Sequence, residues 1–498
     1  MSIIEEDPLA RMSKAVASLS AFPFGSAQQL ARAVRSGAVS SVELLRAYLD
    51  RVDRLNPAIN AIVVDDRDRA LTTARAADRA LAKGRLTGPL HGVPMTVKES
   101  FDLAGRPTTW GFPAFAGNVA SEDAVVVSRL RAAGAVIFGK SNVPLALADF
   151  QSYNDVYGTT NNPWDQTRGP GGSSGGAAAA LAAGLTGLEY GSDIGGSIRN
   201  PAAYCGVYGH KPTFGIVPKR GHTLSPLLVS EGPISVVGPL ARSAGDLALA
   251  LKVTAGADLE DGFRLVLPPP PRSLEGLRVA VWLDQPDLAP VDDAVTGPIE
   301  AAARALAAAG ATVDFTARPD IDVAEAHDTY LQLLMATLSA RDPGYDQMVE
   351  RAAKLDPDDH GQYALNLRYS TARHREVAIA GETRDLHRWK WRAFFQDHDV
   401  LLAPITATPP FPHDHSEPLG ARTMNVNGAE VPYFGQLFWA GLAISAHLPA
   451  TAAPVGATST GLPVGMQIIG DAYRDRTTIW LADQLARQIG GFTPPTLA

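Results

Sequence analysis

The sequence predicts an α/β protein: a single large domain with a central mixed β-sheet covered by helices on both faces. Short apolar runs alternate with helical patterns along the chain, which is typical of layered α/β folds. The 498 residues are 46% hydrophobic and 19% charged, a composition that fits a globular protein with a large core. No run has the roughly 18 uninterrupted apolar residues that a membrane-spanning helix needs. We therefore expect a globular protein that does not span a membrane.

The first 85 residues predict helices that pack on the rest of the chain. Ser40-Ser41-Val42-Glu43 has the form of a capping box, and the apolar residues after it recur at helical spacing. Asn56-Pro57 predicts the end of that helix, because proline has no backbone N–H to donate. We therefore treat residues 1–85 as an N-terminal helical segment and residues 86–498 as the core.

Strand and helix patterns alternate in the first half of the core. Residues 93–97 and 135–138 predict short strands. Between them, Ser121 predicts the cap of a helix that ends before Gly134. The alanine-rich run 177–185 predicts a buried helix, since alanine has the highest helix propensity.

A strand–helix–strand unit and an insertion follow. Residues 277–282 and 311–315 predict strands on either side of a helix at 299–309. Residues of about 320–395 are helix-like, polar and poor in motifs. We interpret them as a helical variable insertion that shapes the rim of the core.

Charge and cysteine content narrow the classes of function. The chain carries 44 Lys and Arg against 52 Asp and Glu, a net charge of −8, and has no basic run. Nucleic acid is therefore not an expected partner, because phosphate contacts need clustered Lys and Arg. The early acids of the N-terminus do not resemble a secretory signal, and we expect a cytoplasmic protein. The single cysteine, Cys205, is expected to be a buried packing residue rather than a reactive thiol.

A glycine loop, Gly171-Gly172-Ser173-Ser174-Gly175-Gly176, precedes the alanine-rich helix. This order places backbone N–H groups and the positive end of the helix around Ser173 and Ser174. The loop lacks the Gly-Lys-Ser/Thr ending of a phosphate cradle. It matches the Gly-x-Ser-x-Gly form of a nucleophile elbow twice, so an esterase of the α/β-hydrolase type with a distant histidine stays open.

A second serine lies in Gly195-Gly196-Ser197, between Asp193 and Arg199. Two glycines allow a sharp turn that presents successive N–H groups, which suit a developing oxyanion next to the serine hydroxyl. Asp193 and Arg199 carry opposite charges and suit a brace of this turn. A surface turn without a catalytic role is the alternative.

Lys98 follows the apolar run 93–97, which predicts burial. Burial lowers the pKa of a lysine by disfavouring the ammonium form, and a neutral amine can accept a proton. The alternative is a surface lysine that pairs with Glu99 and keeps its charge in water.

Taken in order, the three motifs resemble the amidase signature family. The resemblance rests on Gly-x-Pro-x-x-x-Lys at 92–98, the glycine loop at 171–176 and Gly-Ser-Asp-x-Gly-Gly-Ser-Ile-Arg at 191–199, with the two serines at the family's spacing. Segments 139–142, 158–164 and 461–468 resemble the family as well. The similarity thus covers nearly the whole chain except about 320–395, and it implies the amidase signature fold.

The resemblance implies a role for each site residue. Ser197 matches the acylated nucleophile. Ser173 matches the bridging serine, which a non-proline cis peptide bond typically precedes, and Lys98 matches the base. The other implied positions are the N–H groups of Ile194, Gly195, Gly196 and Ser197 as the oxyanion hole, and Ser174, Asp193 and Arg199 as supporting residues. Departures are small: Glu99, Ile194 and Ala177 stand where the family often has Asp, Thr and Ser.

The implied activity is hydrolysis of a carboxylic amide through an acyl-enzyme, without a metal or other cofactor. The apolar segment 433–448 is a candidate wall for a hydrophobic or aryl amide, although such residues also suit a plain core. A carbamate is a further expected substrate, and esterase activity a side reaction. The nearby His413 and His415 have no evident third ligand, so no metal site is expected there.

Other functions stay open at this point. One is the glutamine-hydrolysing subunit of a transfer-RNA amidotransferase, and another is a non-catalytic binding scaffold. The expected partner is a small molecule, and the oligomeric state is a monomer or a homodimer.

Overall fold

The computed structural model describes residues 22–224, 232–258, 264–340, 342, 344–359 and 361–497. Within them, the largest sheet has eight strands in the order β10-β9-β11-β15-β14-β7-β8-β6. β10, β9 and β11 pair in parallel, and the other neighbours pair antiparallel. In this order the strands span Thr312–Asp314, Arg278–Val281, Val400–Pro404, Pro463–Ile469, Ala450–Ala457, Tyr208–Lys211, Val236–Ala241 and Glu189–Asp193. The predicted mixed sheet is confirmed.

Helices pack on both faces of this sheet. One group, α6 and α7, packs on one face, and α8, α9 and α15 form the other group. The bounds are α6 (Gly175–Ala182), α7 (Arg199–Cys205), α8 (Ala244–Thr254), α9 (Asp293–Ala308) and α15 (Asp475–Ile489). Cys205, at the end of α7, is buried, as predicted.

A smaller sheet, of order β1-β3-β2, carries the lysine. β1 (Ile62–Asp65) runs antiparallel to β3 (Val136–Ser141), and β3 runs parallel to β2 (Pro94–Lys98). β2 also lies beside β6, where the Thr96 N–H donates to the Leu188 carbonyl at 3.4 Å. The ends of β2 and β6 therefore lie together, although their motifs are almost a hundred residues apart in sequence.

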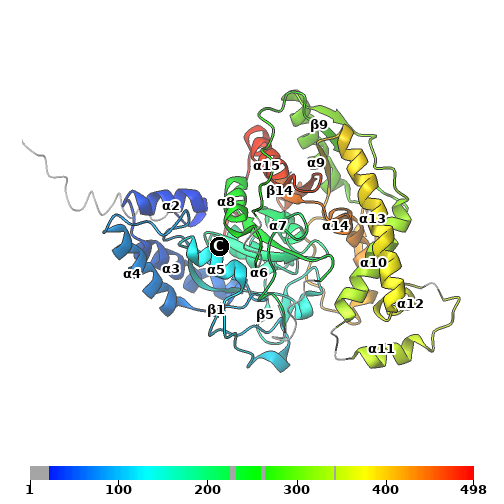
Figure 1. Cartoon of the computed structure of the whole chain (residues 1–498), viewed down its shortest axis with the longest axis horizontal. Helices are drawn as coiled ribbons and strands as arrows, with labels where there is room; N and C mark the ends of the chain where they lie inside the picture. The colour runs from blue at the N-terminus through cyan, green and yellow to red at the C-terminus, as the bar shows by residue number, and fades with distance from the viewer. Residues whose placement is uncertain are drawn as a thin grey trace, which may run out of the picture.

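The N-terminal helices are α2 (Ala27–Arg35), α3 (Ser41–Ile59) and α4 (Arg67–Leu81). The capping box is confirmed: Ser40 Oγ accepts the Glu43 N–H at 3.1 Å, and Glu43 Oε2 accepts the Ser40 N–H at 2.9 Å. In Figure 1 these helices lie at the end of the molecule opposite α10–α13.

Two expected helix boundaries were wrong. α3 continues through Pro57, because a proline in the last turn removes little of the hydrogen bonding, and Asn60 in the left-handed conformation ends the helix. The chain then forms β1, so the segment before residue 86 is not wholly helical and shares a sheet with the core. α5 (Val125–Ala132) begins after Ser121, because the Ala124 N–H donates to the Asp102 carbonyl and holds this segment as a loop.

The described residues of the region of about 320–395 form four helices on one side of the molecule (Figure 1): α10 (Val323–Ser339), α11 (Tyr345–Ala352), α12 (Gln362–Ser370) and α13 (His374–Asp397). α10 packs against α14 (Leu437–Ser445), which connects the insertion to the core. The small hairpins β4–β5 (Tyr153–Asn154, Gly158–Thr159) and β12–β13 (Thr423–Val426, Ala429–Pro432) lie outside the main sheets. Short 3-10 helices span Phe22–Phe24, Pro113–Phe115, Leu145–Leu147, Leu419–Ala421 and Tyr433–Gln436. Of the helices described, none is both long and apolar enough to cross a membrane.

Candidate active site

Lys98 ends β2 inside the protein and contacts two serines. Its Nζ donates to Ser173 Oγ at 2.7 Å and to Ser192 Oγ at 3.0 Å, and its side chain has no exposed surface. Burial lowers the pKa of Lys98 to about 7, although the charges of Asp193 and Glu99 act in the opposite direction. The interpretation of Lys98 as a surface lysine is therefore wrong, and its amine is partly neutral at physiological pH.

Glu99 does not form an ion pair with Lys98. Its carboxylate accepts the N–H of Thr109 at 2.6 Å, the N–H of Trp110 at 3.0 Å and the hydroxyl of Tyr157 at 3.2 Å. These three bonds hold the buried Glu99 carboxylate near Lys98, but the carboxylate makes no direct contact with the Lys98 amine.

Neighbouring residues pack closely against the first two glycines of the glycine loop. A Cβ on Gly172 would lie 2.2 Å from the Asp149 carbonyl oxygen, and one on Gly171 would lie 2.6 Å from Asn200 Oδ1. The bond between Gly172 and Ser173 is a non-proline cis peptide. Only glycine fits at positions 171 and 172, because a side chain there would collide with these neighbours. This close packing places the Ser173 hydroxyl next to the Lys98 amine.

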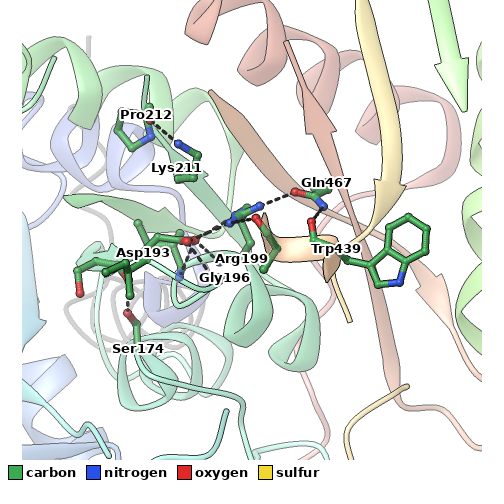
Figure 2. Close-up of polar contacts among 12 residues, drawn as sticks. Ser174, Asp193, Gly196, Arg199, Lys211, Pro212, Trp439 and Gln467 are labelled. Atoms are coloured by element: carbon green, nitrogen blue, oxygen red, sulfur yellow. Dashed lines mark hydrogen bonds and ion pairs between the residues drawn. The ribbon is translucent and has the colours of Figure 1, made fainter. Parts of the chain in front are cut away.

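Ser197 lies in the turn between β6 and α7, and Asp193 holds this turn (Figure 2). Asp193 Oδ1 accepts the Gly196 N–H at 2.8 Å, and Oδ2 accepts the Ile198 N–H at 3.1 Å. Arg199 donates from Nη2 to Oδ1 and from Nε to Oδ2, both at 3.0 Å, and neither side chain is exposed. Such a bidentate pair fixes the orientation of both partners.

The turn is tied to the rest of the core through Arg199 and the glycine loop. Arg199 Nη1 donates to Gln467 Oε1 at 2.5 Å, and Gln467 Nε2 donates to the Trp439 carbonyl at 2.7 Å (Figure 2). The Ser174 N–H donates to the Ser197 carbonyl at 3.1 Å, and Ser174 Oγ donates to the Ser192 carbonyl at 3.4 Å. The sequence-predicted serines thus come from two loops that are bonded directly to each other.

Asp193 stays ionised in this buried position. Burial alone opposes its charge, yet the Arg199 guanidinium, the Lys211 ammonium and the Gly196 N–H hold the pKa of its carboxyl below the ordinary value. Lys211 is itself buried and donates to the Pro212 carbonyl at 3.0 Å (Figure 2), and burial lowers its pKa to about 7.

The four expected oxyanion donors divide into two kinds. The Gly196 N–H donates to Asp193, so in this structure it braces the turn. In the described part of the chain, the N–H groups of Ile194, Gly195 and Ser197 donate to no protein acceptor. The Ile194 carbonyl accepts the Tyr330 hydroxyl at 3.0 Å, which holds this peptide from the side of α10.

Segment 433–448 has two environments. Phe438 and Trp439 pack edge-on against Trp282, with ring centres 5.8 and 6.1 Å apart, and are core residues. Leu437 instead lies against the turn, because a Cβ on Gly195 would come within 3.1 Å of its Cδ2. Ala440 also lies against the turn, since a Cβ on Gly196 would come within 3.0 Å of its Cβ.

Two contacts were missed by the sequence reasoning. Ser192 stands in the quoted motif directly before Asp193, and this position was a usable signal for the second partner of Lys98. Tyr330 lies in the insertion, where no motif marks it.

The histidine-based alternative finds no geometric support. His222 contacts Ser100 at 2.9 Å, and no histidine in the described ranges hydrogen-bonds to Ser173, Ser174 or Ser197. His413 Nε2 lies 3.0 Å from Asn161 Oδ1, and the ring of His415 stacks on that of Tyr153 with the ring centres 3.7 Å apart. No group of three metal-binding side chains occurs among the described residues.

Known proteins are similar to this chain in both fold and sequence. The Amidase family model matches residues 43–479. An indoleacetamide hydrolase of Bradyrhizobium diazoefficiens is 35% identical over 93% of this chain and 86% of its own. A glutamyl-tRNA(Gln) amidotransferase subunit of Anaeromyxobacter sp. (strain K) is 34% identical over 93% of this chain and 96% of its own.

Solved structures agree. A bacterial aryl acylamidase of the amidase signature enzymes superposes with a TM-score of 0.79 at 26% identity, covering 94% of this chain and 96% of that one. A 6-aminohexanoate cyclic dimer hydrolase in complex with substrate gives 0.75 at 27% identity, covering 94% and 97%. Fold and sequence together define an amide hydrolase. The chain belongs to the amidase signature family.

Proposed function

We propose that the protein hydrolyses aryl or hydrophobic amides through an acyl-enzyme on Ser197, with Lys98 as the base and Ser173 as the relay. The observation that carries this proposal is the buried Lys98 amine, with a pKa of about 7, at 2.7 Å from Ser173 Oγ. A base whose pKa lies near the working pH transfers protons efficiently in both directions.

The proton relay uses the two serines on Lys98 differently. When Lys98 is neutral, one N–H continues to donate to Ser192, which leaves the lone pair to accept the proton of Ser173. Ser173 in turn takes the proton of Ser197 as Ser197 Oγ attacks the substrate carbonyl. Lysine then holds the proton until the leaving nitrogen takes it back through Ser173.

The negative charge of the tetrahedral intermediate falls on the carbonyl oxygen. We assign the N–H groups of Ile194, Gly195 and Ser197 as its donors, because these have no protein acceptor within the described ranges, and Gly196 as a brace through Asp193. Donors that are already oriented cost no reorganisation during the reaction. The departing amine leaves an ester on Ser197, and water attacks that ester with the same relay in reverse.

The substrate class follows from the neighbourhood of the turn and from the relatives. Leu437 lies against Gly195, and the relatives include a hydrolase named for indoleacetamide and an aryl acylamidase. An aryl or hydrophobic amide fits this setting. A carbamate presents the same planar carbonyl and nitrogen leaving group, so urethanase activity is part of the proposal.

Labelling the nucleophile tests the mechanism. Treatment with a fluorophosphonate should add one label, on the peptide that contains Ser197, as measured by the mass of the intact and digested protein. Ser197→Ala should remove the label and Lys98→Ala should slow its addition. A label on Ser197→Ala at the wild-type rate would refute the assignment.

The second candidate is glutamine hydrolysis as part of a transfer-RNA amidotransferase, favoured by the 34% identity that spans 96% of such a relative. Turnover by the purified chain alone separates the two. We expect kcat/KM for an anilide or indole-type amide to exceed that for glutamine by at least ~100-fold. A preference for glutamine would favour the amidotransferase role.

A further inference from the structure

Helix α13 carries large apolar side chains on its outward face. Ile379, Leu386 and Trp389 are 54%, 64% and 69% exposed. The opposite face of the same helix buries Ala380, His387, Trp391, Phe394 and Phe395. Figure 1 shows α13 running along the side of the molecule away from the N-terminal helices. Contiguous apolar patches on a protein surface are a common feature of contact sites with other molecules.

The outward residues have the spacing of a helix pair. Steps of four and three alternate along the row, as in the a and d positions of a heptad. This row, the α13 seam, consists of Arg375, Ile379, Glu382, Leu386, Trp389 and Ala393. Four of its six members are apolar, and α13 is long enough, at 24 residues, to present the whole seam without a break.

The seam maps onto itself when a second helix runs antiparallel. With the two-fold axis at position 384, Ile379 lies opposite Trp389 of the second copy. Glu382 lies opposite Leu386, and Arg375 opposite Ala393. A two-fold dimer uses the same surface on both copies, so this symmetry is the condition such an interface must meet.

The charges beside the seam agree with this register. Glu376 and Lys390 lie on the same flank at opposite ends of the helix, so the antiparallel arrangement brings Glu376 beside Lys390 of the second copy, twice by symmetry. Glu382 lies within one helical turn of the same lysine. Opposite charges at the flanks set both orientation and register in paired helices.

We propose that two copies of this chain associate through the α13 seam, antiparallel about position 384. A lipid surface is the less suitable occupant, because helices that lie on membranes carry a cationic polar face. Here the seam holds one base and one acid, Arg375 and Glu382, and α13 carries five Lys and Arg against four Asp and Glu, so its polar surface is mixed in charge and not strongly cationic.

The molecular mass in solution tests the association. Sedimentation equilibrium of the full chain should give twice the 52.5 kDa of one copy. Leu386→Glu should weaken the association by at least ~100-fold, because two carboxylates would enter the centre of the interface. Val349→Glu is the matched control: Val349 is 42% exposed on α11, outside the seam, and its change should leave the dimer intact. A wild-type monomer, or equal effects of the two changes, would overturn the proposal.

Disulfide trapping tests the register. Mixed and oxidised, the Ile379→Cys and Trp389→Cys proteins should cross-link to each other, whereas each alone should not, and the buried Cys205 should not compete. The exchange Glu376→Lys should weaken the dimer, and adding Lys390→Glu should restore it. Cross-linking of Ile379→Cys with itself would overturn the antiparallel arrangement. A wild-type monomer that sediments with anionic vesicles, and loses this with Leu386→Glu, would assign the seam to lipid instead.

Discussion

At the scale of single residues, the proposed role of Lys98 as the base predicts that its protonation state sets the working pH range. Its amine is buried beside the hydroxyls of Ser173 and Ser192. The nearby acids, Asp193 and Glu99, do not hydrogen-bond to the amine and act on it only by electrostatic attraction. Burial favours the neutral form, and the negative charges of Asp193 and Glu99 moderate that effect. With both effects, the pKa of Lys98 is about 7.

We predict an acid limb in the pH profile of kcat/KM near pH 7. Protonated Lys98 cannot act as a base, so activity should fall as pH decreases through about 7. Glu99→Gln removes a negative charge that raises the pKa of Lys98, so it should move this limb to lower pH. The measurement is kcat/KM of both proteins between about pH 5 and about pH 9. A limb that moves to higher pH in the variant would show that the charge acts in another way.

Ser192 should act as a positioning residue for the lysine. Ser192→Ala removes the acceptor at 3.0 Å, and the amine can then rotate away from Ser173. We expect kcat/KM to fall by about tenfold, which corresponds to one hydrogen bond of about 1.4 kcal/mol. KM should change little, and Ser192→Thr, which keeps the hydroxyl, should retain most of the activity. Equal losses in both variants would point to packing instead of the hydrogen bond.

At the scale of elements, the glycine loop and the turn after β6 form one bonded unit. The Ser174 N–H donates to the Ser197 carbonyl, and Gly172 lies against the Asp149 carbonyl with no room for a side chain. This hydrogen bond joins the backbone next to Ser173 to the backbone of Ser197. The position of each hydroxyl depends on backbone contacts with the other loop.

Gly172→Ala should therefore disable the enzyme. The added methyl would lie 2.2 Å from the Asp149 carbonyl oxygen, so the loop must move, and Ser173 must move with it. We expect kcat to fall by at least ~100-fold, the usual effect of displacing a reacting group by about 1 Å. Gly381→Ala on α13 is the control, since a Cβ there meets no atom within 4 Å. Full activity in Gly172→Ala would show that the loop tolerates the shift.

At the scale of the whole molecule, Tyr330 of the helical insertion reaches the turn that carries Ser197. Tyr330 on α10 is buried, packs on Gly441 of α14 and donates to the Ile194 carbonyl. The peptide held in this way neighbours the proposed oxyanion donors. A region without any recognisable motif thus supports the turn that carries Ser197.

Tyr330→Phe should lower kcat without unfolding the protein. Loss of one buried hydrogen bond frees the Ile194 peptide, and we expect a decrease of about three- to tenfold. Tyr363→Phe, on the exposed face of α12, should have no effect on steady-state rates. A change in KM alone would instead place Tyr330 in substrate binding.

The sequence predicted the mixed sheet, because strand–helix–strand patterns such as 277–315 are locally encoded. It also predicted that Lys98 is buried directly after a strand, since the run 93–97 is apolar, and β2 includes Lys98 as its last residue. It did not predict that Ser192 would reach Lys98, because that contact depends on β2 lying beside β6. The start of α5 was wrong for a similar reason, because the Asp102 carbonyl accepts the Ala124 N–H and holds the preceding residues as a loop. The end of α3 was wrong for a local reason: a proline in the last turn removes little of the helix's hydrogen bonding. The roles of the site residues remain predictions until the variants are measured.

The solitary thiol of Cys205 has a practical consequence for all these measurements. Cys205 has no exposed surface, and burial raises the pKa of its thiol far above the usual value for cysteine. Reagents that react with thiolates should therefore not modify it. A cysteine placed anywhere on the surface can therefore carry a maleimide dye at a single defined position. The wild-type background is already suited to fluorescence reporting.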